Sequence, residues 1–524
     1  MRDRLLIVGW DGADWDILRP LMDQGELPTL SSMVEEGATA DLLSTIPYQS
    51  WSAWSTFLTG LGPAGHGVYD FVERDPTHPE LRVPVSSRSI RARTFLQVMS
   101  DAGHEVRAGN IPVTFPPFPV RGRIISGVAI PPDSEYVLPA SWARELDRTA
   151  PFPVNGMEWM RFGDRPDRLV AEARFFVERR TESFLALLDG EWSVAACVYV
   201  APDRLQHPFG AYLLPSHPGY ATSSSSQLGE EIRAVYRMLD GHLSRLREAA
   251  GPATTTVLIS DHGFRPITRM VSLRQTLAEL RFTVPARMAG NLSSLRRSRW
   301  VRALATRPAG RAIRRRLTPP TVDWSRSVAY DSATGWGVSI NLKGREPKGI
   351  VDPNDFERIL EDVRLALLSY KDPATGSPIA AGVHRREELF DGPYASLSPD
   401  LIVEPAELVG FGPGKSPSWD TDWPTGTHRR RGILVASGGR TETSDLGERH
   451  LADVPATVLA YFGLQRLGEG RAISEISGAE EPGTIQVDSG TESPPPAWGE
   501  VPAPATEQEE EHIAQHLRDL GYIE

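Results

Sequence analysis

Short apolar runs alternate with longer segments of helical pattern along most of the chain. Residues 5–10, 192–200 and 254–259 each have the length and apolar character of a buried strand. Residues 15–36 and 226–249 have a helical pattern, and the second of these segments places its apolar side chains on one stripe. Such alternation is typical of a sheet covered on both faces. The pattern therefore predicts an α/β fold with a mostly parallel central sheet sandwiched by helices.

The alternating pattern changes in the second half of the chain. We expect residues 1–264 and 425–477 to form two parts of one core, with residues 265–424 inserted between them as a cap subdomain. Residues 287–316, within the cap, carry clusters of arginine. These clusters favour either a solvated insertion or a lid that attracts an anionic substrate.

The last part of the chain predicts a linker followed by a helix. Residues 478–505 are rich in Pro, Gly and Glu, which is typical of a linker. Residues 506–524 have a helical pattern with Ile513, Leu517 and Leu520 on one narrow stripe. An isolated helix of this length is marginal in water. We therefore expect this C-terminal helix to dock on its own domain, with oligomerisation or partner binding as the alternative.

The composition limits the classes of function. The 524 residues carry a net charge of −12, which argues against general nucleic-acid binding. The single cysteine, Cys197, excludes an internal disulfide and a cysteine-rich metal site. No apolar run approaches the length of a membrane span, and the first residues lack the pattern of a signal peptide. These features predict a cytoplasmic protein without a membrane span.

Three of the predicted strands lead into an aspartate, namely Asp11, Asp203 and Asp261. Ligands of open parallel sheets bind beyond the carboxyl ends of the strands, so these carboxylates are expected to meet at one edge. His207 follows the second aspartate by four residues, and His262 follows the third directly. Carboxylate and imidazole ligands suit zinc or manganese, and two such sets suit a two-metal site. The alternative for any single aspartate is a turn residue.

Residues 50–59 begin with a serine and then repeat aromatic and aliphatic side chains at helical spacing. We predict a helix with Ser50 at its N-terminus, where unpaired N–H groups and the helix dipole favour an anion. Serine is also a preferred N-cap residue, so capping is the alternative role. Trp51 and Trp54 are predicted to lie in the core or in a pocket wall, and Asp14 to serve the turn after the first strand.

Six motifs occur in a defined order between residues 5 and 463. They are Val8-Gly9-Trp10-Asp11-Gly12, Ser50 with Thr59-Gly60, Gly62-Pro63-Ala64-Gly65-His66-Gly67, Pro202-Asp203-Arg204-Leu205-Gln206-His207, Ser260-Asp261-His262-Gly263 and Gly426-Thr427-His428. Each motif is weak by itself. Together they resemble the alkaline phosphatase superfamily, and within it the type I phosphodiesterase and nucleotide pyrophosphatase branch.

The resemblance implies an alkaline phosphatase-like fold and a hydrolase of phosphodiesters or nucleotide pyrophosphates. It implies two divalent metal ions as cofactors, Zn²⁺ or alternatively Mn²⁺, and Ser50 as a nucleophile that forms a phosphoseryl intermediate. The implied ligand sets are Asp11, Ser50, Asp261 and His262 for one metal, and Asp203, His207 and His428 for the other. His428 enters through the resemblance alone. The expected partner is a small phosphorylated substrate.

Two departures from the branch leave the reaction class open. Phosphodiesterases of the branch more often carry threonine where Ser50 stands, and serine is shared with the phosphomonoesterases. Trp51 occupies the position of the phosphate-binding arginine of classical alkaline phosphatases. This difference favours a diester substrate over a monoester. A phosphomonoesterase or phosphomutase of the same superfamily is therefore the alternative enzyme. A non-catalytic binding or scaffold protein on this fold is the alternative of a different class.

Overall fold

Nine strands form a central sheet in the computed structural model, which describes residues 3–75, 78–286, 322–332, 336–414, 416–478 and 507–520. In order across the sheet they are β19 (Ser444–His450), β2 (Ala38–Leu43), β18 (Arg431–Ser437), β9 (Thr255–Ile259), β1 (Leu5–Trp10), β8 (Val194–Tyr199), β5 (Val106–Ile111), β6 (Gly122–Ser126) and β7 (Val137–Leu138). β18 and β7 run antiparallel to their neighbours, and the other strands share one direction. The observed sheet confirms the predicted, mostly parallel architecture.

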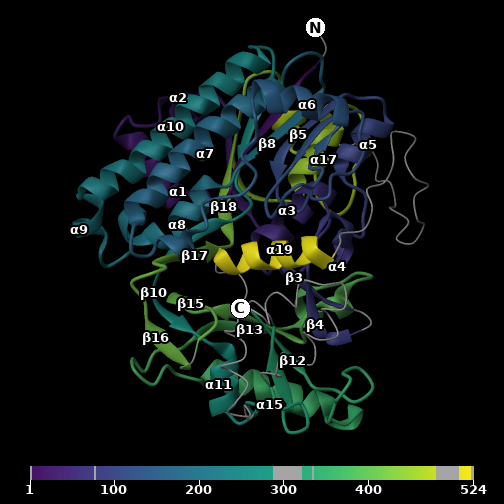
Figure 1. The fold of residues 1–524 in the computed structure, drawn as a ribbon, viewed down its shortest axis with the longest axis vertical. Helices are drawn as coiled ribbons and strands as arrows, with labels where there is room; N and C mark the ends of the chain where they lie inside the picture. The colour runs from purple at the N-terminus through teal and green to yellow at the C-terminus, as the bar shows by residue number, and fades with distance from the viewer. Residues whose placement is uncertain are drawn as a thin grey trace.

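The middle strands of this sheet are the apolar runs of the sequence. β1, β8 and β9 are buried along their whole length, because helices cover both faces of the sheet. Figure 1 shows the two helical layers on opposite sides of the strands. One layer comprises α1 (Trp15–Asp23), α2 (Pro28–Glu36), α7 (Pro166–Leu187), α8 (Ala201–Leu213) and α10 (Gln227–Ala250), and the other comprises α3 (Ser50–Thr59), α5 (Phe95–Asp101) and α17 (Asp453–Tyr461). Apolar side chains from all three layers form one continuous core.

Two elements differ from the sequence prediction. The helical pattern of residues 15–36 divides into two helices, α1 and α2, a division that the pattern did not show. Gly25 adopts a left-handed φ of 73° between them, and Pro28 begins the second helix. β2 was not predicted at all. Its residues alternate between buried and partly exposed, and its partners β18 and β19 lie far along the chain.

The chain between β9 and β18 forms two smaller sheets beside the main one, in the lower part of Figure 1. One contains β10 (Gly263–Val271), β15 (Leu408–Phe411), β16 (Ser418–Asp420) and β17 (Gly426–Arg429), and the other contains β11 (Ala329–Asp331), β12 (Gly337–Ile340), β13 (Ala380–Arg385) and β14 (Leu401–Pro405). The helices α11 (Leu273–Glu279), α15 (Phe356–Ser369) and α16 (Arg386–Leu389) pack here. This part has its own apolar core.

Short elements complete the described chain. They are α4 (Pro63–His66), α6 (Ala140–Thr149), α9 (Tyr220–Ser224), α18 (Ser474–Ser477), the hairpin of β3 (Val72–Asp75) and β4 (His78–Pro84), and the 3₁₀ helices η1 (Ser87–Ser89), η2 (Trp159–Phe162), η3 (Pro353–Asp355) and η4 (Ala395–Leu397). Among the described residues, no helix combines the length and the apolar character needed to cross a membrane. The arginine-rich residues 287–316 and residues 479–505 of the expected linker lie outside the described residues.

The C-terminal helix α19 (Glu507–Asp519) lies at the boundary between the main sheet and the smaller sheets (Figure 1). Ile513, Leu517 and Leu520, the stripe recognised in the sequence, are buried in the main core. His516 is also buried, and its Nδ1 lies 3.0 Å from Glu158 Oε1 just before η2. α19 therefore packs on the body of its own chain through both apolar and polar contacts.

Candidate metal centre

The carboxyl ends of three adjacent strands carry the three aspartates. Asp11 follows β1 directly, Asp261 lies two residues beyond β9, and Asp203 lies in the first turn of α8, after β8. Because β1 pairs in parallel with both β8 and β9, the three side chains reach the same edge of the sheet. All three are almost completely buried. The structure thus brings these carboxylates together.

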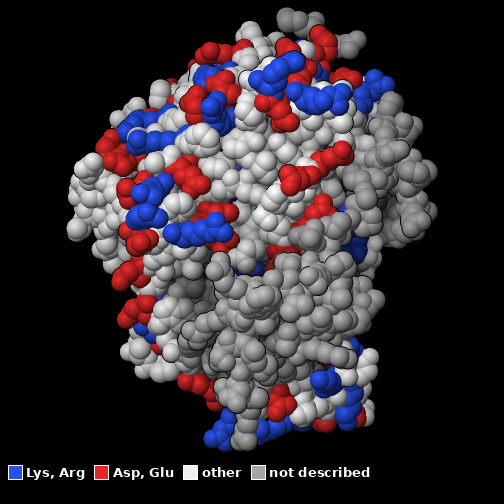
Figure 2. Space-filling model, in the orientation of Figure 1, with Lys and Arg blue, Asp and Glu red and all other residues white. Residues whose placement is uncertain are grey.

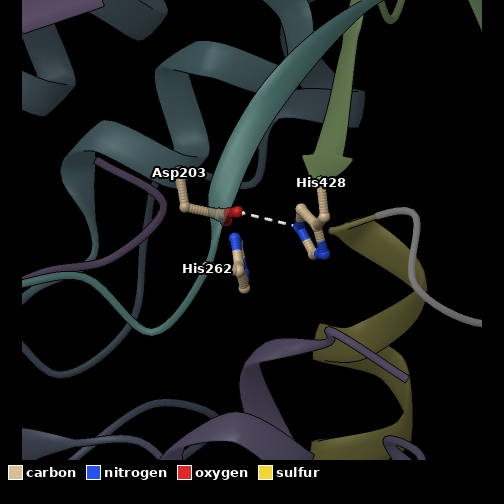
Figure 3. Close-up of side chains that lie close together, drawn as sticks. All are labelled: Asp203, His262 and His428. Carbon is tan, nitrogen blue, oxygen red and sulfur yellow. Dashed lines mark hydrogen bonds and ion pairs between the residues drawn. The ribbon is translucent and has the colours of Figure 1, made fainter. Parts of the chain in front are cut away.

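Three histidines face the aspartates. His262 follows one of them in the chain, and His207 lies one turn beyond Asp203 on α8. His428 lies on β17, which pairs antiparallel with β10 so that His428 is opposite Phe264. Figure 3 shows Asp203, His262 and His428 directed toward one another from three different segments. The pairing of β10 with β17 therefore completes the cluster.

The side chains that the resemblance assigns to the first metal form one group. His262 Nε2 lies 3.3 Å from Asp261 Oδ2 and 3.7 Å from Asp11 Oδ1. Ser50 Oγ lies 3.2 Å from the same nitrogen and 3.5 Å from Asp11 Oδ1. Asp11, Asp261 and His262 can place their ligand atoms within 4.8 Å of one another. All four side chains therefore direct polar atoms at one place.

The side chains assigned to the second metal form an adjoining group. His428 Nε2 lies 3.1 Å from Asp203 Oδ1 and 3.1 Å from His207 Nε2. His207 Nε2 lies 3.4 Å from the same Asp203 oxygen. The geometry also joins His262 to Asp203 and His428, since these three can place ligand atoms within 4.8 Å of one another. The His262 and His428 rings stack with their centroids 3.8 Å apart. The two groups are thus continuous.

Backbone carbonyl groups orient the three imidazole rings. The Nδ1 atom of His207 lies 3.3 Å from the Gly426 oxygen, and that of His428 lies 3.2 Å from the Tyr48 oxygen. The Nδ1 atom of His262 is likewise 3.2 Å from the oxygen of the next residue. A carbonyl accepts a hydrogen bond only from a protonated Nδ1, so each Nε2 faces the cluster and can bind a cation when it carries no proton. In metal sites, carbonyl groups that accept a hydrogen bond from the other ring nitrogen orient the histidine ligands in the same way.

The Nε2 atoms and the carboxylate oxygens provide a test of whether a cation fits the site. His207 Nε2 and His428 Nε2 face each other at 3.1 Å, and when neither carries a proton their lone pairs repel unless a positive charge lies between or beside them. Among the described residues, Asp261 Oδ2 is a buried oxygen that accepts no hydrogen bond. Nitrogen and carboxylate oxygen are ligands that Zn²⁺ and Mn²⁺ accept. The donor set therefore fits divalent cations.

The pKa values of the cluster reflect a concentration of buried charge. Burial and the neighbouring Asp203 raise the pKa of Asp11 to about 8. Burial and Asp11 raise the pKa of Asp261 well above its usual value. Burial also acts to raise the pKa of Asp203, but interactions with the His207 and His428 imidazoles and the charge of Arg204 hold it well below its usual value. Buried carboxylates of this kind are normally paired or bound to metal ions.

Ser50 is the first residue of α3, as predicted from the sequence. Gln49 occupies the N-cap position, so the capping role considered for Ser50 is wrong. The Ser50 side chain is buried, and its hydroxyl faces Asp11 and His262. The serine oxygen thus lies at the N-terminus of a helix and beside a cluster of side chains that could hold a metal ion.

Three aromatic residues that the sequence did not name as site residues contact the candidate ligands. Trp54 donates a hydrogen bond from Nε1 to Asp11 Oδ2 at 2.9 Å. The Phe264 ring is edge-on to His207 at 4.9 Å between centroids, and Trp159 stacks on His207 at 5.4 Å. Trp54 and Phe264 each lie within four residues of a predicted site residue, so this short distance along the chain could have indicated that they lie near the site. Trp159 lies far from every motif.

Several solved structures have the same fold, and their names are those of enzymes of phosphorylated or phosphonate compounds. Murine ectonucleotide pyrophosphatase/phosphodiesterase 5 superposes with a TM-score of 0.55 at 13% identity, covering 91% of this chain and 100% of that chain. Its inactive variant in complex with AMP gives 0.56 at 13% identity with the same coverage. Phosphonoacetate hydrolase from Sinorhizobium meliloti 1021, in complex with phosphonoacetate, gives 0.51 at 16% identity, covering 83% and 90%. These likenesses show the alkaline phosphatase-like fold.

Sequence comparison identifies the family. No curated protein matches the chain significantly. Residues 5–429, in contrast, match the family model described as type I phosphodiesterase/nucleotide pyrophosphatase. The matched region covers most of the chain and contains all of the side chains that form the cluster. The chain belongs to the type I phosphodiesterase/nucleotide pyrophosphatase family, whose members are phosphoric ester hydrolases.

Proposed function

We propose that this chain is a metal-dependent phosphodiesterase that uses Ser50 as its nucleophile. The observation that carries the proposal is the position of Ser50 Oγ, 3.2 Å from His262 Nε2 and 3.5 Å from Asp11 Oδ1, within a cluster of buried carboxylates and imidazoles. When bound, two divalent cations would lower the pKa of the serine hydroxyl and offset the charge of the phosphoryl oxygens. The residues that would hold them are Asp11, Ser50, Asp261 and His262 for one ion, and Asp203, His207 and His428 for the other.

The chemistry at Ser50 proceeds in two steps. Ser50 Oγ loses its proton and attacks phosphorus, while the bond from phosphorus to the leaving oxygen breaks and that oxygen gains a proton. A phosphoseryl diester then remains on the first residue of α3. Water cleaves the bond between Oγ and phosphorus, which releases a phosphomonoester and restores the hydroxyl. The N-terminus of α3 favours the negative charge of the phosphoryl group throughout.

The proposed substrate is a small phosphorylated compound. The murine neighbour binds AMP and the bacterial neighbour binds phosphonoacetate, and both ligands are small anions. On the face drawn in Figure 2, acidic and basic side chains of the described residues are interspersed. This distribution and the net charge of −12 support a small anionic substrate rather than a nucleic acid, which requires a basic surface.

We infer that the cap, residues 265–424, contributes to substrate selection. Trp336 of this segment packs edge-on against Tyr48, with the ring centroids 4.7 Å apart. Tyr48 lies two residues before Ser50, and its carbonyl group also orients His428. A substrate bound at Ser50 therefore lies next to a residue that contacts the cap. Replacement of Trp336 is expected to change the KM for some phosphodiesters more than for others, depending on their leaving groups.

Substitution of Ser50 tests the proposed nucleophile. The substrates are bis-p-nitrophenyl phosphate, a diester, and p-nitrophenyl phosphate, a monoester, each with Zn²⁺ or Mn²⁺ present. Ser50→Ala removes the attacking oxygen and is expected to lower kcat/KM by several orders of magnitude. Ser50→Thr is the matched control, because it keeps a hydroxyl group, and it is expected to retain activity.

Each outcome of this assay distinguishes one function from another. Wild-type turnover by Ser50→Ala would contradict the role of the serine as nucleophile. A preference for the monoester would identify the chain as a phosphomonoesterase instead. A wild-type protein with neither bound metal nor turnover would support a binding or scaffold protein on this fold.

A further inference from the structure

The Asp14 carboxylate lies where three segments that carry candidate metal ligands meet. Asp14 follows Asp11 by three residues and is the N-cap of α1, which agrees with the turn role predicted from the sequence. Its side chain is completely buried, with 0% exposed surface. A buried carboxylate needs several donors, so its partners show which parts of the chain it joins.

Four donors occupy the two oxygens of Asp14. The Asp16 N–H donates to Oδ1 at 2.8 Å, and the Phe264 N–H donates to Oδ2 at 2.8 Å. Arg429 donates from Nε to Oδ2 at 2.6 Å and from Nη2 to Oδ1. A carboxylate has about four lone-pair sites. The hydrogen-bonding capacity of Asp14 is therefore fully used by groups of the protein.

The partners of Asp14 are the neighbours of candidate ligands on two other segments. Phe264 lies two residues after His262, and Arg429 directly follows His428. The approach is close, because a Cβ on Gly263 would lie 2.3 Å from Asp14 Oδ2. Asp14 thus joins the segment after β1 to the β10 and β17 segments at the point where each carries its ligand.

The side chain of Phe264 transmits this restraint to the imidazoles. Its ring is edge-on to His207 and His428, with centroids 4.9 Å and 5.3 Å away. It is tilted against His262 at 6.1 Å. The ring therefore contacts histidines of both proposed metal sets, and a shift of the Phe264 backbone would move the surface against which all three rings pack.

We propose that Asp14 is a positioning residue for the metal centre, which holds the two ligand sets in register through Phe264 and Arg429. This inference rests on the proposed function. Asp14 does not itself bind a metal, because its four acceptor sites are occupied. Hydrogen-bonding partners beyond the ligands commonly change metal affinity by about 10- to 100-fold when they are replaced.

Asp14→Asn is the informative substitution, and Asp16→Asn is its matched control. Asparagine has one acceptor oxygen, and its NH₂ group would face two of the N–H donors around Asp14. Asp16 accepts from the same arginine, at 2.7 Å from Nη1, but its side chain is half exposed and contacts no candidate ligand in the described part of the chain. Zinc is titrated into the metal-free protein by calorimetry. We expect Asp14→Asn to weaken zinc affinity by about 10- to 100-fold and Asp16→Asn to leave it unchanged.

The affinity is measured on protein that circular dichroism shows to be folded. Reduced stability alone does not alter the Kd of molecules that remain folded, so a merely structural role of Asp14 would leave the zinc affinity unchanged. Arg429→Lys is a milder variant that keeps the backbone donors to Asp14 and loses the two-pronged contact. We expect Arg429→Lys to weaken zinc binding as well. If Asp14→Asn does not fold, this variant tests the positioning role of Asp14.

The results separate this inference from the proposed function. Two bound zinc ions in the wild type and unchanged affinity in a folded Asp14→Asn or Arg429→Lys variant would overturn the positioning role alone. Absence of zinc and manganese binding in the wild type would contradict the proposed function, and the positioning role with it. Weaker binding in Asp14→Asn but not in Asp16→Asn is the result that supports it.

Discussion

The hydrogen bond from Trp54 Nε1 to Asp11 Oδ2 can be removed with little other change. Both side chains are buried, and the donor lies 2.9 Å from the oxygen. Trp54→Phe keeps an aromatic ring and loses the donor. A hydrogen bond to a charged group contributes about 1.5–3 kcal/mol. Since 1.4 kcal/mol corresponds to a factor of ten, we expect the affinity for the metal ion that Asp11 is proposed to bind to fall by roughly 10- to 150-fold.

Competition between the protein and a chromophoric zinc chelator measures this affinity, and hydrolysis of bis-p-nitrophenyl phosphate at limiting zinc measures its consequence. Trp15→Phe is the matched control. Trp15 is also buried and donates from Nε1 to the Ala40 oxygen at 3.3 Å, but it lies outside the metal centre. A folded Trp54→Phe protein with wild-type zinc affinity would refute the assignment of Asp11 as a ligand supported by Trp54. An equal loss in Trp15→Phe would show that the effect is not specific to the site.

Three further predictions concern the metal, the backbone and the C-terminal helix. Dialysis against EDTA is expected to abolish phosphodiester hydrolysis and added Zn²⁺ or Mn²⁺ to restore it; full activity in the chelator would contradict a metal-dependent reaction. A Cβ at Gly263 would lie 1.9 Å from the Arg431 oxygen, so Gly263→Ala should lower the free energy of unfolding in urea by about 1–3 kcal/mol. Gly241→Ala, with no neighbouring atom within 4 Å, is its control and should raise that energy by about 0.5–1 kcal/mol. Leu517→Ala removes a fully buried side chain of α19 and should weaken the docking of that helix by about 2–5 kcal/mol, seen as faster amide hydrogen exchange in α19; unchanged exchange would contradict the observed packing.

The secondary structure of the core follows closely from the sequence. The apolar runs predicted as strands are β1, β8 and β9, and the long helical segment at residues 226–249 is α10 within one residue at each end. Buried strands and amphipathic helices have periodicities that depend on residues near one another in the chain. The helical pattern of residues 15–36 did not show the break between α1 and α2, although glycine after a helix end and proline at a helix start are typical of such breaks, as with Gly25 and Pro28 here.

Part of the candidate site was also accessible from the sequence. Asp11, Asp203 and Asp261 follow predicted strands, and a parallel sheet places the carboxyl ends of its strands at one edge. His207 and His262 are close to two of them in the chain. His428 had no such neighbour, and only the resemblance to a family nominated it. Its place depends on the pairing of β17 with β10.

The sequence by itself determined the mostly parallel sheet, the helix that begins at Ser50 and the aspartates at the strand ends, because local periodicity and the direction of parallel strands encode them. Only the tertiary structure decided which groups surround those residues. The indole of Trp54 on Asp11, the ring of Phe264 among the imidazoles and the bond from Arg429 to Asp14 join segments far apart in the chain. Such contacts depend on how the layers pack and on the pairing of β10 with β17, which no local pattern specifies.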